Sequence, residues 1–262
     1  MRPREGRTKL AQRPKRGDDG GVKSTALQRS VRAALRRAAD PSRAAAMQAY
    51  MKSEMPYLGV TAPKVRGVCR EVFASYVFLD AATWRSDVLA LWRGAKHREE
   101  RYAAISLGGH GKAGSFQTLD ALPMYEEMIV TGAWWDYVDD LAEHRVGPLL
   151  LAYPFEMRNI LLAWSRSDDM WKRRTSIICQ MHFREEIDRK LLYACIQPSL
   201  ASKEFFLRKA IGWALRQLAW YDVDEVVRYV KEHEPELSSL SKREALKHAA
   251  RLKAGSAKSR AK

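Results

Sequence analysis

The sequence has little that would place the protein in a membrane or outside the cell. No apolar run approaches the roughly 18–20 residues that a membrane-spanning helix needs. The opening segment, MRPREGRTKLAQRPKRGDDGG, has no apolar stretch of the kind that a secretory signal carries. The three cysteines, Cys69, Cys179 and Cys195, form no CxxC spacing and leave an odd count. We therefore expect reduced thiols and a cytoplasmic protein with no membrane partner.

Several motifs of nucleotide and metal chemistry are also missing. There is no GxxxxGK[ST] loop, so nucleotide hydrolysis has no support. There is no HExxH pair or EF-hand loop, and the six histidines are scattered along the chain. The nucleophile elbow of a Ser–His–Asp hydrolase is absent as well. We expect neither a metal nor a cofactor.

Basic residues outnumber acidic ones by 46 to 31, and most of the excess lies at the two ends. Residues 1–23 hold eight basic and three acidic residues, and residues 241–262 hold eight and one. The remaining 217 residues carry a net charge of only +3. We expect a disordered basic arm over 1–23 and a basic tail over 254–262. Such ends indicate a polyanionic partner, unless they serve only solubility.

Residues 24–253 read as one all-α domain. Apolar residues recur at intervals of three and four, and no run of alternating β-branched residues interrupts them. Pro63 in TAPKVR marks one helix start, and we interpret Ser241 and Glu244 in SKRE as a capping box. The expected helices span residues 25–38, 42–54, 62–77, 81–93, 97–109, 116–131, 133–150, 154–166, 169–184, 185–197, 203–220, 222–233 and 241–253.

Two segments align without gaps at an offset of 35 residues, namely SDDMWKRRTSIICQ (167–180) and SKEFFLRKAIGWAL (202–215). Each has a polar start, a bulky pair, a basic pair and then small and aliphatic residues. The same offset carries RKAI onto REAL (243–246). A period near 35 with two helices per unit is typical of a HEAT-like α-solenoid, whose curvature creates a concave face. We therefore predict an all-α, HEAT-like helical repeat with a concave cleft.

The stretch GAWWDYVDDLAEHRVG (132–147) places an aromatic plane beside an acid. In one continuous helix, Trp134 shares an apolar face with Val138 and Leu141, whereas Trp135 and Asp139 stand four residues apart on an adjacent face. An unpaired buried carboxylate costs several kcal/mol, so this is poor core design. Removing the Asp139 charge is therefore expected to leave stability unchanged or to raise it.

A lone carboxylate such as Asp139 suits one kind of hydrolysis. Most leaving groups need an acid, but a base already made cationic by alkylation leaves as a neutral molecule. Breaking its glycosidic bond builds positive charge on the sugar, which a nearby carboxylate stabilises. An aromatic plane such as Trp135 would favour the cationic base by cation–π attraction.

A second stripe combines cations with an aromatic ring. Lys209, Trp213 and Arg216 share one helical face, which suits a phosphate backbone and a stacked sugar or base. In the preceding repeat, Arg174 shares a face with His182. The alternative is that Trp213 is an ordinary core residue and the cations form a solvated face.

The sequence resembles the AlkD-like DNA alkylation repair glycosylases, which are HEAT-repeat proteins that excise positively charged alkylated purines. The resemblance covers residues 42–252. It rests on MQAYMKSEMPYLGVTAP (47–63), YEEMIVTGAWWDYVD (125–139), WKRRTSI (171–177), SKEFFLRKAIGWALR (202–216) and LSKREALKH (240–248), in the order of the family.

The resemblance implies a role for each matching residue. Trp135 and Trp213 match the aromatic residues that flank the lesion, and Asp139 matches the acid that stabilises the sugar cation and positions water. Arg174 matches a phosphate-binding arginine. Tyr50 and Arg216 fall at further DNA-facing positions.

Two positions depart from the family pattern. Tyr137 replaces a small residue in WWDxVD, and His182 stands where a longer cation is expected. The resemblance implies a monomeric DNA glycosylase for N3- and N7-alkylated purines in duplex DNA. The alternative is a DNA- or RNA-binding solenoid that has lost catalytic activity, and Tyr137 would be consistent with that loss. A scaffold for a protein partner is disfavoured.

Overall fold

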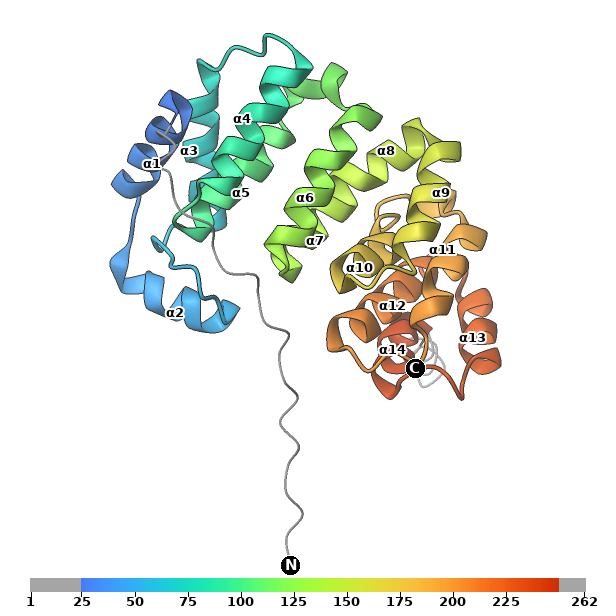
Figure 1. The fold of residues 1–262 in the computed structure, drawn as a ribbon. Coiled ribbons are helices and arrows are strands. Elements are labelled where there is room, and N and C mark those ends of the chain that lie inside the picture. The colour runs from blue at the N-terminus through green and yellow to red at the C-terminus, as the bar shows by residue number, and fades with distance from the viewer. Residues whose placement is uncertain (1–24, 250–262) are drawn as a thin grey trace, which may run out of the picture.

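The computed structural model describes residues 25–249, which are helical almost throughout and contain no strand (Figure 1). The predicted arm (1–23) and tail (254–262) lie outside this range. Within it, no helix is both long and apolar enough to cross a membrane. The α-helices are α1 (Ala26–Arg37), α2 (Pro41–Met51), α3 (Ala62–Ala74), α4 (Ala81–Arg93), α5 (Arg98–Gly108), α6 (Leu122–Gly132), α7 (Trp135–Leu141), α8 (Gly147–Ala152), α9 (Pro154–Trp164), α10 (Met170–Ile178), α11 (Arg189–Ile196), α12 (Phe205–Leu218), α13 (Val223–Glu232) and α14 (Ser239–Ala245).

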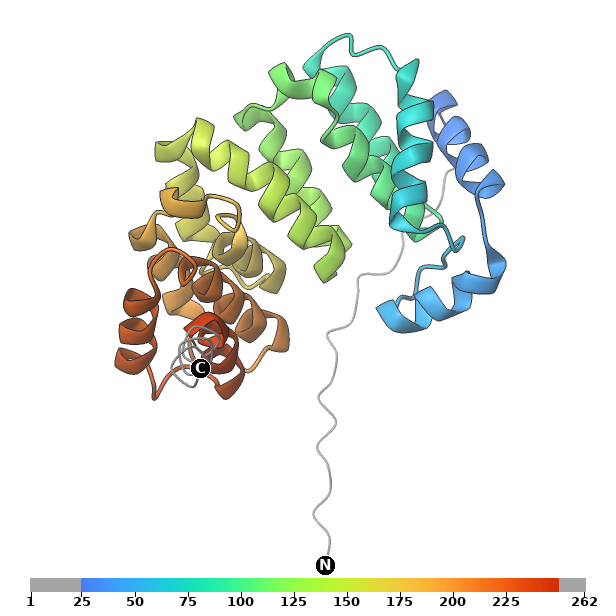
Figure 2. The same ribbon diagram turned by 180° about the vertical axis from the view of Figure 1, so that it is seen from behind.

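The helices stack side by side into an arch (Figures 1 and 2). One row is formed by α3, α5, α7, α10, α12 and α14, each of which packs against the next. The helices α1, α4, α6, α9, α11 and α13 flank this row and pack on its members. One tip of the arch carries α2 and the other carries α12 to α14. The structure confirms the predicted all-α helical repeat.

The offset of 35 residues corresponds to one step along the row. Trp171 of α10 packs against Phe206 of α12, with ring centroids 5.0 Å apart. Lys209 of α12 forms an ion pair with Glu244 of α14, again one offset further along the sequence. Equivalent positions of successive repeats are therefore neighbours in space, as stacked repeats require.

The predicted helix 133–150 is interrupted. Trp134 has extended backbone and precedes α7, and a π-helical turn, η3 (Ala142–Val146), separates α7 from α8. Val138 and Leu141 are buried as predicted. Ala142, the first residue of the π turn, is fully buried.

Other predicted helix boundaries, and one predicted cap, were also wrong. The helix predicted from residue 116 begins at Leu122, after two 3₁₀ turns, η1 (Gly111–Phe116) and η2 (Leu119–Ala121). The helix predicted to reach residue 184 ends at Ile178 and is followed by η4 (Arg184–Glu186); a further 3₁₀ turn, η5 (Gln197–Ser199), follows α11. The SKRE capping box is not formed, because the Ser238 hydroxyl caps α14 by accepting from the backbone N–H of Ser241.

A Gly-rich string, GHGKAG (109–114), matches the spacing GxGxxG of dinucleotide-binding loops. The motif needs a strand before the loop and a helix after it. Here the string follows α5 and runs into the 3₁₀ turn η1. The match has no structural support as a nucleotide site.

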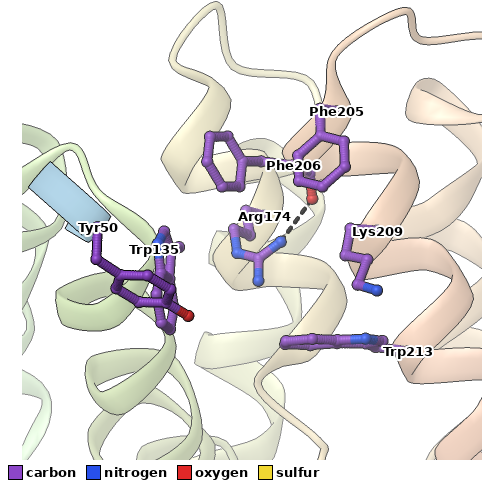
Figure 3. A pocket seen from close by; sticks show the side chains of 7 residues that line it. All are labelled: Tyr50, Trp135, Arg174, Phe205, Phe206, Lys209 and Trp213. Carbon is purple, nitrogen blue, oxygen red and sulfur yellow. Dashed lines mark hydrogen bonds between the residues drawn. The ribbon is translucent and has the colours of Figure 1, made fainter. Parts of the chain in front are cut away.

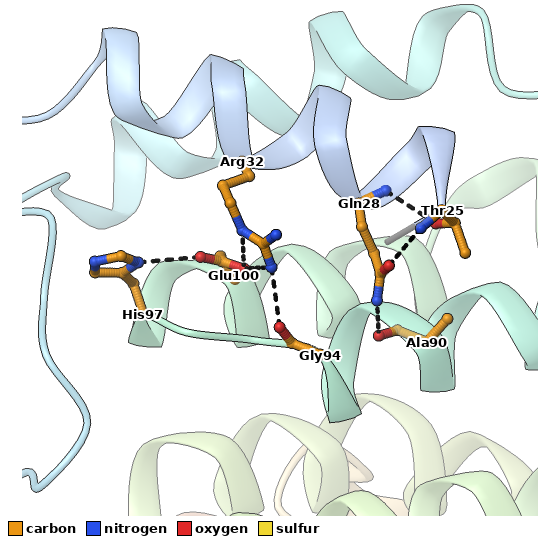
Figure 4. A network of polar contacts seen from close by, with 7 residues as sticks. All are labelled: Thr25, Gln28, Arg32, Ala90, Gly94, His97 and Glu100. Carbon is orange, nitrogen blue, oxygen red and sulfur yellow. Dashed lines mark hydrogen bonds and ion pairs between the residues drawn. The ribbon is translucent and has the colours of Figure 1, made fainter. Parts of the chain in front are cut away.

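Buried polar contacts hold the blue N-terminal end of the arch together (Figure 4). Arg32 of α1 donates to the nearly buried carboxylate of Glu100 on α5 and, at 2.9 Å, to the carbonyl of Gly94. Thr25 caps α1 in a capping box with Gln28, whose side chain also donates to the carbonyl of Ala90. These contacts fix α1 on the α4–α5 corner.

The position of α2 depends on the segment that follows it. Gly59 has a φ of +81°, and a Cβ there would lie 1.9 Å from the carbonyl oxygen of Asp40. Only glycine allows this approach. The buried carboxylate of Glu99 then accepts from the backbone N–H groups of Leu58 and Val60. Tyr50, near the end of α2, is 78% exposed.

Candidate functional site

A cavity of about 370 Å³ opens on the inner side of the arch (Figure 3). Its walls come from α2, α7, α10 and α12, and it brings together five of the predicted site residues. Its lining residues are Tyr50, Trp135, Arg174, Phe205, Phe206, Lys209 and Trp213. Since α2 and α12 stand at opposite tips of the arch, a cavity that both line lies on the concave face.

One wall of this cavity combines an indole with two cations. The ring of Trp213 is partly exposed and lies beneath the Arg174 guanidinium and the Lys209 ammonium, each 5.5 Å from the ring centroid (Figure 3). Trp135 stands on the other side of Arg174, beside Tyr50 in the view of Figure 3. The alternative that Trp213 is an ordinary core residue does not fit this position.

Asp139 is not a lone carboxylate. Arg174 donates from Nε to Oδ1 of Asp139 at 2.7 Å and from Nη2 to Oδ2 at 2.8 Å, and its Nη1 donates to the carbonyl of Phe206 at 2.5 Å. The Arg174 side chain is 1% exposed and that of Asp139 is 14% exposed. This bidentate pair fixes the orientation of the carboxylate, which lies one helical turn beyond Trp135. A direct phosphate contact by Arg174 stays a prediction, since its three nitrogens already have protein acceptors.

Burial raises the pKa of Asp139 above its usual range, and this effect outweighs the lowering by Arg174. The nearby Asp136 carboxylate raises the pKa of Asp139 further. A buried carboxylate with a raised pKa is a stronger base than an exposed one. Asp139 is therefore both oriented and poorly solvated.

Asp136 belongs to a second buried pair on the same helix. Arg98 of α5 donates from Nη2 to both oxygens of Asp136, at 2.6 and 2.7 Å, and Tyr102 donates to Oδ2 at 2.6 Å. This pair borders a different cavity, of about 300 Å³, between α3, α5 and α7. Trp135 and Asp136 thus face different cavities, as expected for adjacent helical residues.

Comparison with known proteins identifies the family. The sequence matches the profile of the DNA alkylation repair enzymes over residues 31–249. The protein belongs to this family. A search of curated proteins found no match. Among solved structures, the chain is similar to a predicted DNA alkylation repair enzyme from Enterococcus faecalis, with 27% identity, a TM-score of 0.72, and 80% of this chain and 95% of the other covered.

Membership assigns the protein to DNA alkylation repair, with DNA as its substrate. Tyr137, where we expected a small residue, does not line the cavity. Its side chain is fully buried, packs edge-on against Trp92 at 5.3 Å, and lies under the Arg98 guanidinium at 4.2 Å. Tyr137 therefore fills the core, and its size gives no reason to infer a lost activity.

Two predicted DNA contacts do not line the cavity. Arg216, together with Lys209, forms an ion pair with Glu244 of α14, at 2.8 and 2.9 Å. Burial opposes ionisation of Glu244, but Lys247 and Lys209 outweigh it and hold the pKa at about 2. His182 lies beyond the end of α10, where its Nε2 is 2.9 Å from Glu143. The residues that line the cavity therefore do not include Arg216, His182 or Asp139.

Sequence reasoning missed two features: the phenylalanines of the cavity and a pair of stacked histidines. Phe205 and Phe206 line the cavity, although the repeat had marked them only as a bulky pair; their alignment with Met170 and Trp171 was the available signal. The histidines were judged to be scattered, but His144 and His182 stack with ring centroids 4.9 Å apart.

Proposed function

We propose that this repair enzyme is a monofunctional DNA glycosylase that hydrolyses the N-glycosidic bond of N3- and N7-alkylated purines in duplex DNA. The observation that carries the proposal is the Asp139 carboxylate, held by Arg174 next to a cavity walled by Trp135 and Trp213. No step of the proposed reaction depends on a metal or a cofactor.

The reaction needs little acid catalysis, because alkylation has already made the base cationic. The bond between C1′ and the purine nitrogen breaks, its electron pair moves to the base, and the base leaves as a neutral molecule. The sugar is left as an oxocarbenium ion. Water then adds to C1′ and loses a proton. The proton carries away the positive charge, and a neutral abasic sugar remains.

Asp139 would act on the charge that develops at C1′. A preorganised group of this kind typically contributes about 2.7–4 kcal/mol, or roughly 100- to 1000-fold in rate. Arg174 opposes part of the field of the carboxylate, so we assign it to positioning: two parallel donors hold both oxygens of Asp139 in place. The raised pKa also makes Asp139 a suitable acceptor for the proton that water loses.

The aromatic residues and the remaining cation would hold the DNA. Trp135 and Trp213 offer flat faces to the sugar or base, and stacking of this kind is typically worth about 1–3 kcal/mol per base. Lys209 projects into the cavity above Trp213, where an ammonium group suits a phosphate (Figure 3). Tyr50 would approach the DNA from the opposite tip of the arch.

The proposal is tested with duplex DNA that contains a single 7-methylguanine. The full-length protein is added in excess, and the released base is measured by mass spectrometry while alkali-labile abasic sites are counted on the labelled strand. We expect equal amounts of both products. Tight binding without base release would contradict the proposal and favour the alternative of a non-catalytic DNA-binding repeat protein.

A further inference from the structure

A cluster of metal-ligand side chains lies where η3 meets the end of α10. Glu143 and His144 come from the π turn, and His182 comes from the segment after α10. The Nε2 atom of His182 is 2.9 Å from Oε2 of Glu143, and the two imidazole rings stack with an interplanar angle of 14°. One ligand atom from each residue lies within 4.8 Å of the other two.

Two features of the backbone create this cluster. In the π turn, the N–H of Gly147 donates to the carbonyl of Ala142 five residues earlier, and such turns occur frequently at functional sites. A Cβ at Gly147 would lie 2.4 Å from the carbonyl oxygen of Cys179, at the C-terminal end of α10. The missing side chain therefore lets η3 approach the chain end that carries His182. The cluster is a product of this packing rather than of local sequence.

The donor set fits a borderline divalent ion. Two imidazoles and one carboxylate are a known ligand set for catalytic zinc, which binds nitrogen and oxygen at about 2.0–2.2 Å. Ligand atoms around a tetrahedral ion are then roughly 3.3 Å apart, so the His182–Glu143 spacing is already close to the required value. Both histidines are exposed.

We propose that Glu143, His144 and His182 bind a divalent transition-metal ion of the zinc class, with at least one coordination position open to solvent. Asp139 and Asp140 lie close enough to act electrostatically on Glu143, so a dication also relieves repulsion among these carboxylates. The open position would accept water or a phosphate oxygen. The site does not depend on the proposed glycosylase reaction.

The test uses the full chain, purified without a polyhistidine tag and freed of metal by a chelator. Binding of Co²⁺ is followed by its visible absorption, and binding of Zn²⁺ by calorimetry and by the shift in melting temperature. We expect one equivalent to bind. Replacing a ligand should lower affinity more than the roughly 10- to 100-fold loss typical of its supporting residues, so His144→Ala and His182→Ala should each cost at least about 100-fold.

His233→Ala is the matched control, because His233 also lies beside a glutamate, Glu236, at 3.2 Å. No second histidine completes a ligand group there within residues 25–249. The control should bind metal like the wild type, and circular dichroism should show that all three variants are folded. The proposal is overturned if no metal binds, if His144→Ala and His182→Ala bind normally, or if His233→Ala alone loses the site.

Discussion

Asp139→Asn should separate the catalytic role of the carboxylate from its structural role. The change keeps the size of the side chain but removes the charge opposite Arg174, which is 1% exposed and already commits its three nitrogens to protein acceptors. The carbonyl oxygen of an asparagine can accept a hydrogen bond from one of the two Arg174 donors, Nε or Nη2. Its NH₂ group would then face the other donor and could not accept from it. The variant therefore leaves a buried cation without its counter-charge.

The size of the effect follows from two opposing contributions. Removing one partner of a buried pair typically costs about 3–5 kcal/mol. Burial also disfavours the Asp139 charge itself, since it raises the pKa of that carboxyl, so neutralising it recovers part of the loss. We expect a net destabilisation of about 2–3 kcal/mol, which for a domain of this size is roughly 4–12 °C in melting temperature. The ion pair thus reverses the expectation, from the sequence alone, of unchanged or improved stability.

Asp136→Asn is the matched control on the same helix. Both oxygens of its carboxylate accept from Nη2 of a nearly buried arginine, Arg98, but it borders the other cavity. Both variants should lose comparable stability. In single-turnover excision of 7-methylguanine at a temperature where both are folded, Asp139→Asn should lose at least about tenfold, whereas Asp136→Asn should stay close to wild type.

A double-mutant cycle of Asp139→Asn with Arg174→Gln completes the design. Because the two side chains touch, we expect a coupling free energy of about 1–3 kcal/mol in urea denaturation. Additive effects, or a wild-type melting temperature for Asp139→Asn, would refute the structural argument. An active Asp139→Asn beside an inactive Asp136→Asn would show that the acid has been assigned to the wrong cavity.

Three further predictions concern the cavity wall, the basic arm and the α12–α14 contact. Trp213→Ala should weaken binding to alkylated duplex by about 1–3 kcal/mol, as judged by fluorescence anisotropy, while Trp220→Ala, which changes an exposed indole outside the cavity, should bind normally. Deleting residues 1–23 should weaken DNA binding and flatten its dependence on salt, yet leave single-turnover excision at saturating protein unchanged; a large loss at saturation would show that the arm shapes the site. The lowered pKa of Glu244 gives stability that is complete above the unfolded value of about 4.3 and is lost as the pH falls toward about 2. Urea denaturation from pH 6 to 2 should therefore show a steeper loss for wild type than for Glu244→Gln, and equal slopes would contradict this assignment.

Local patterns in the sequence were enough to predict the helices and their stacking. Hydrophobic spacing is set by the 3.6-residue period, so the buried face of α12 follows from its sequence, and Leu207, Ile211 and Leu218 are buried there. The offset of 35 residues likewise predicted which helices become neighbours. The motifs around Trp135, Asp139 and Trp213 predicted the family, which the match over residues 31–249 confirms.

Tertiary packing alone decided which charges meet. Asp139 and Arg174 are 35 residues apart, and nothing in their own segments shows that the two side chains bond to each other rather than to a ligand. The π turn interrupts the regular helical period after Leu141, and Gly147 at its end lies against Cys179 at the end of α10. The same packing joins His144 to His182 across 38 residues. Helical faces follow from backbone geometry within a few residues, whereas ion pairs and ligand sets depend on the distance between chain segments, which only the folded stack determines.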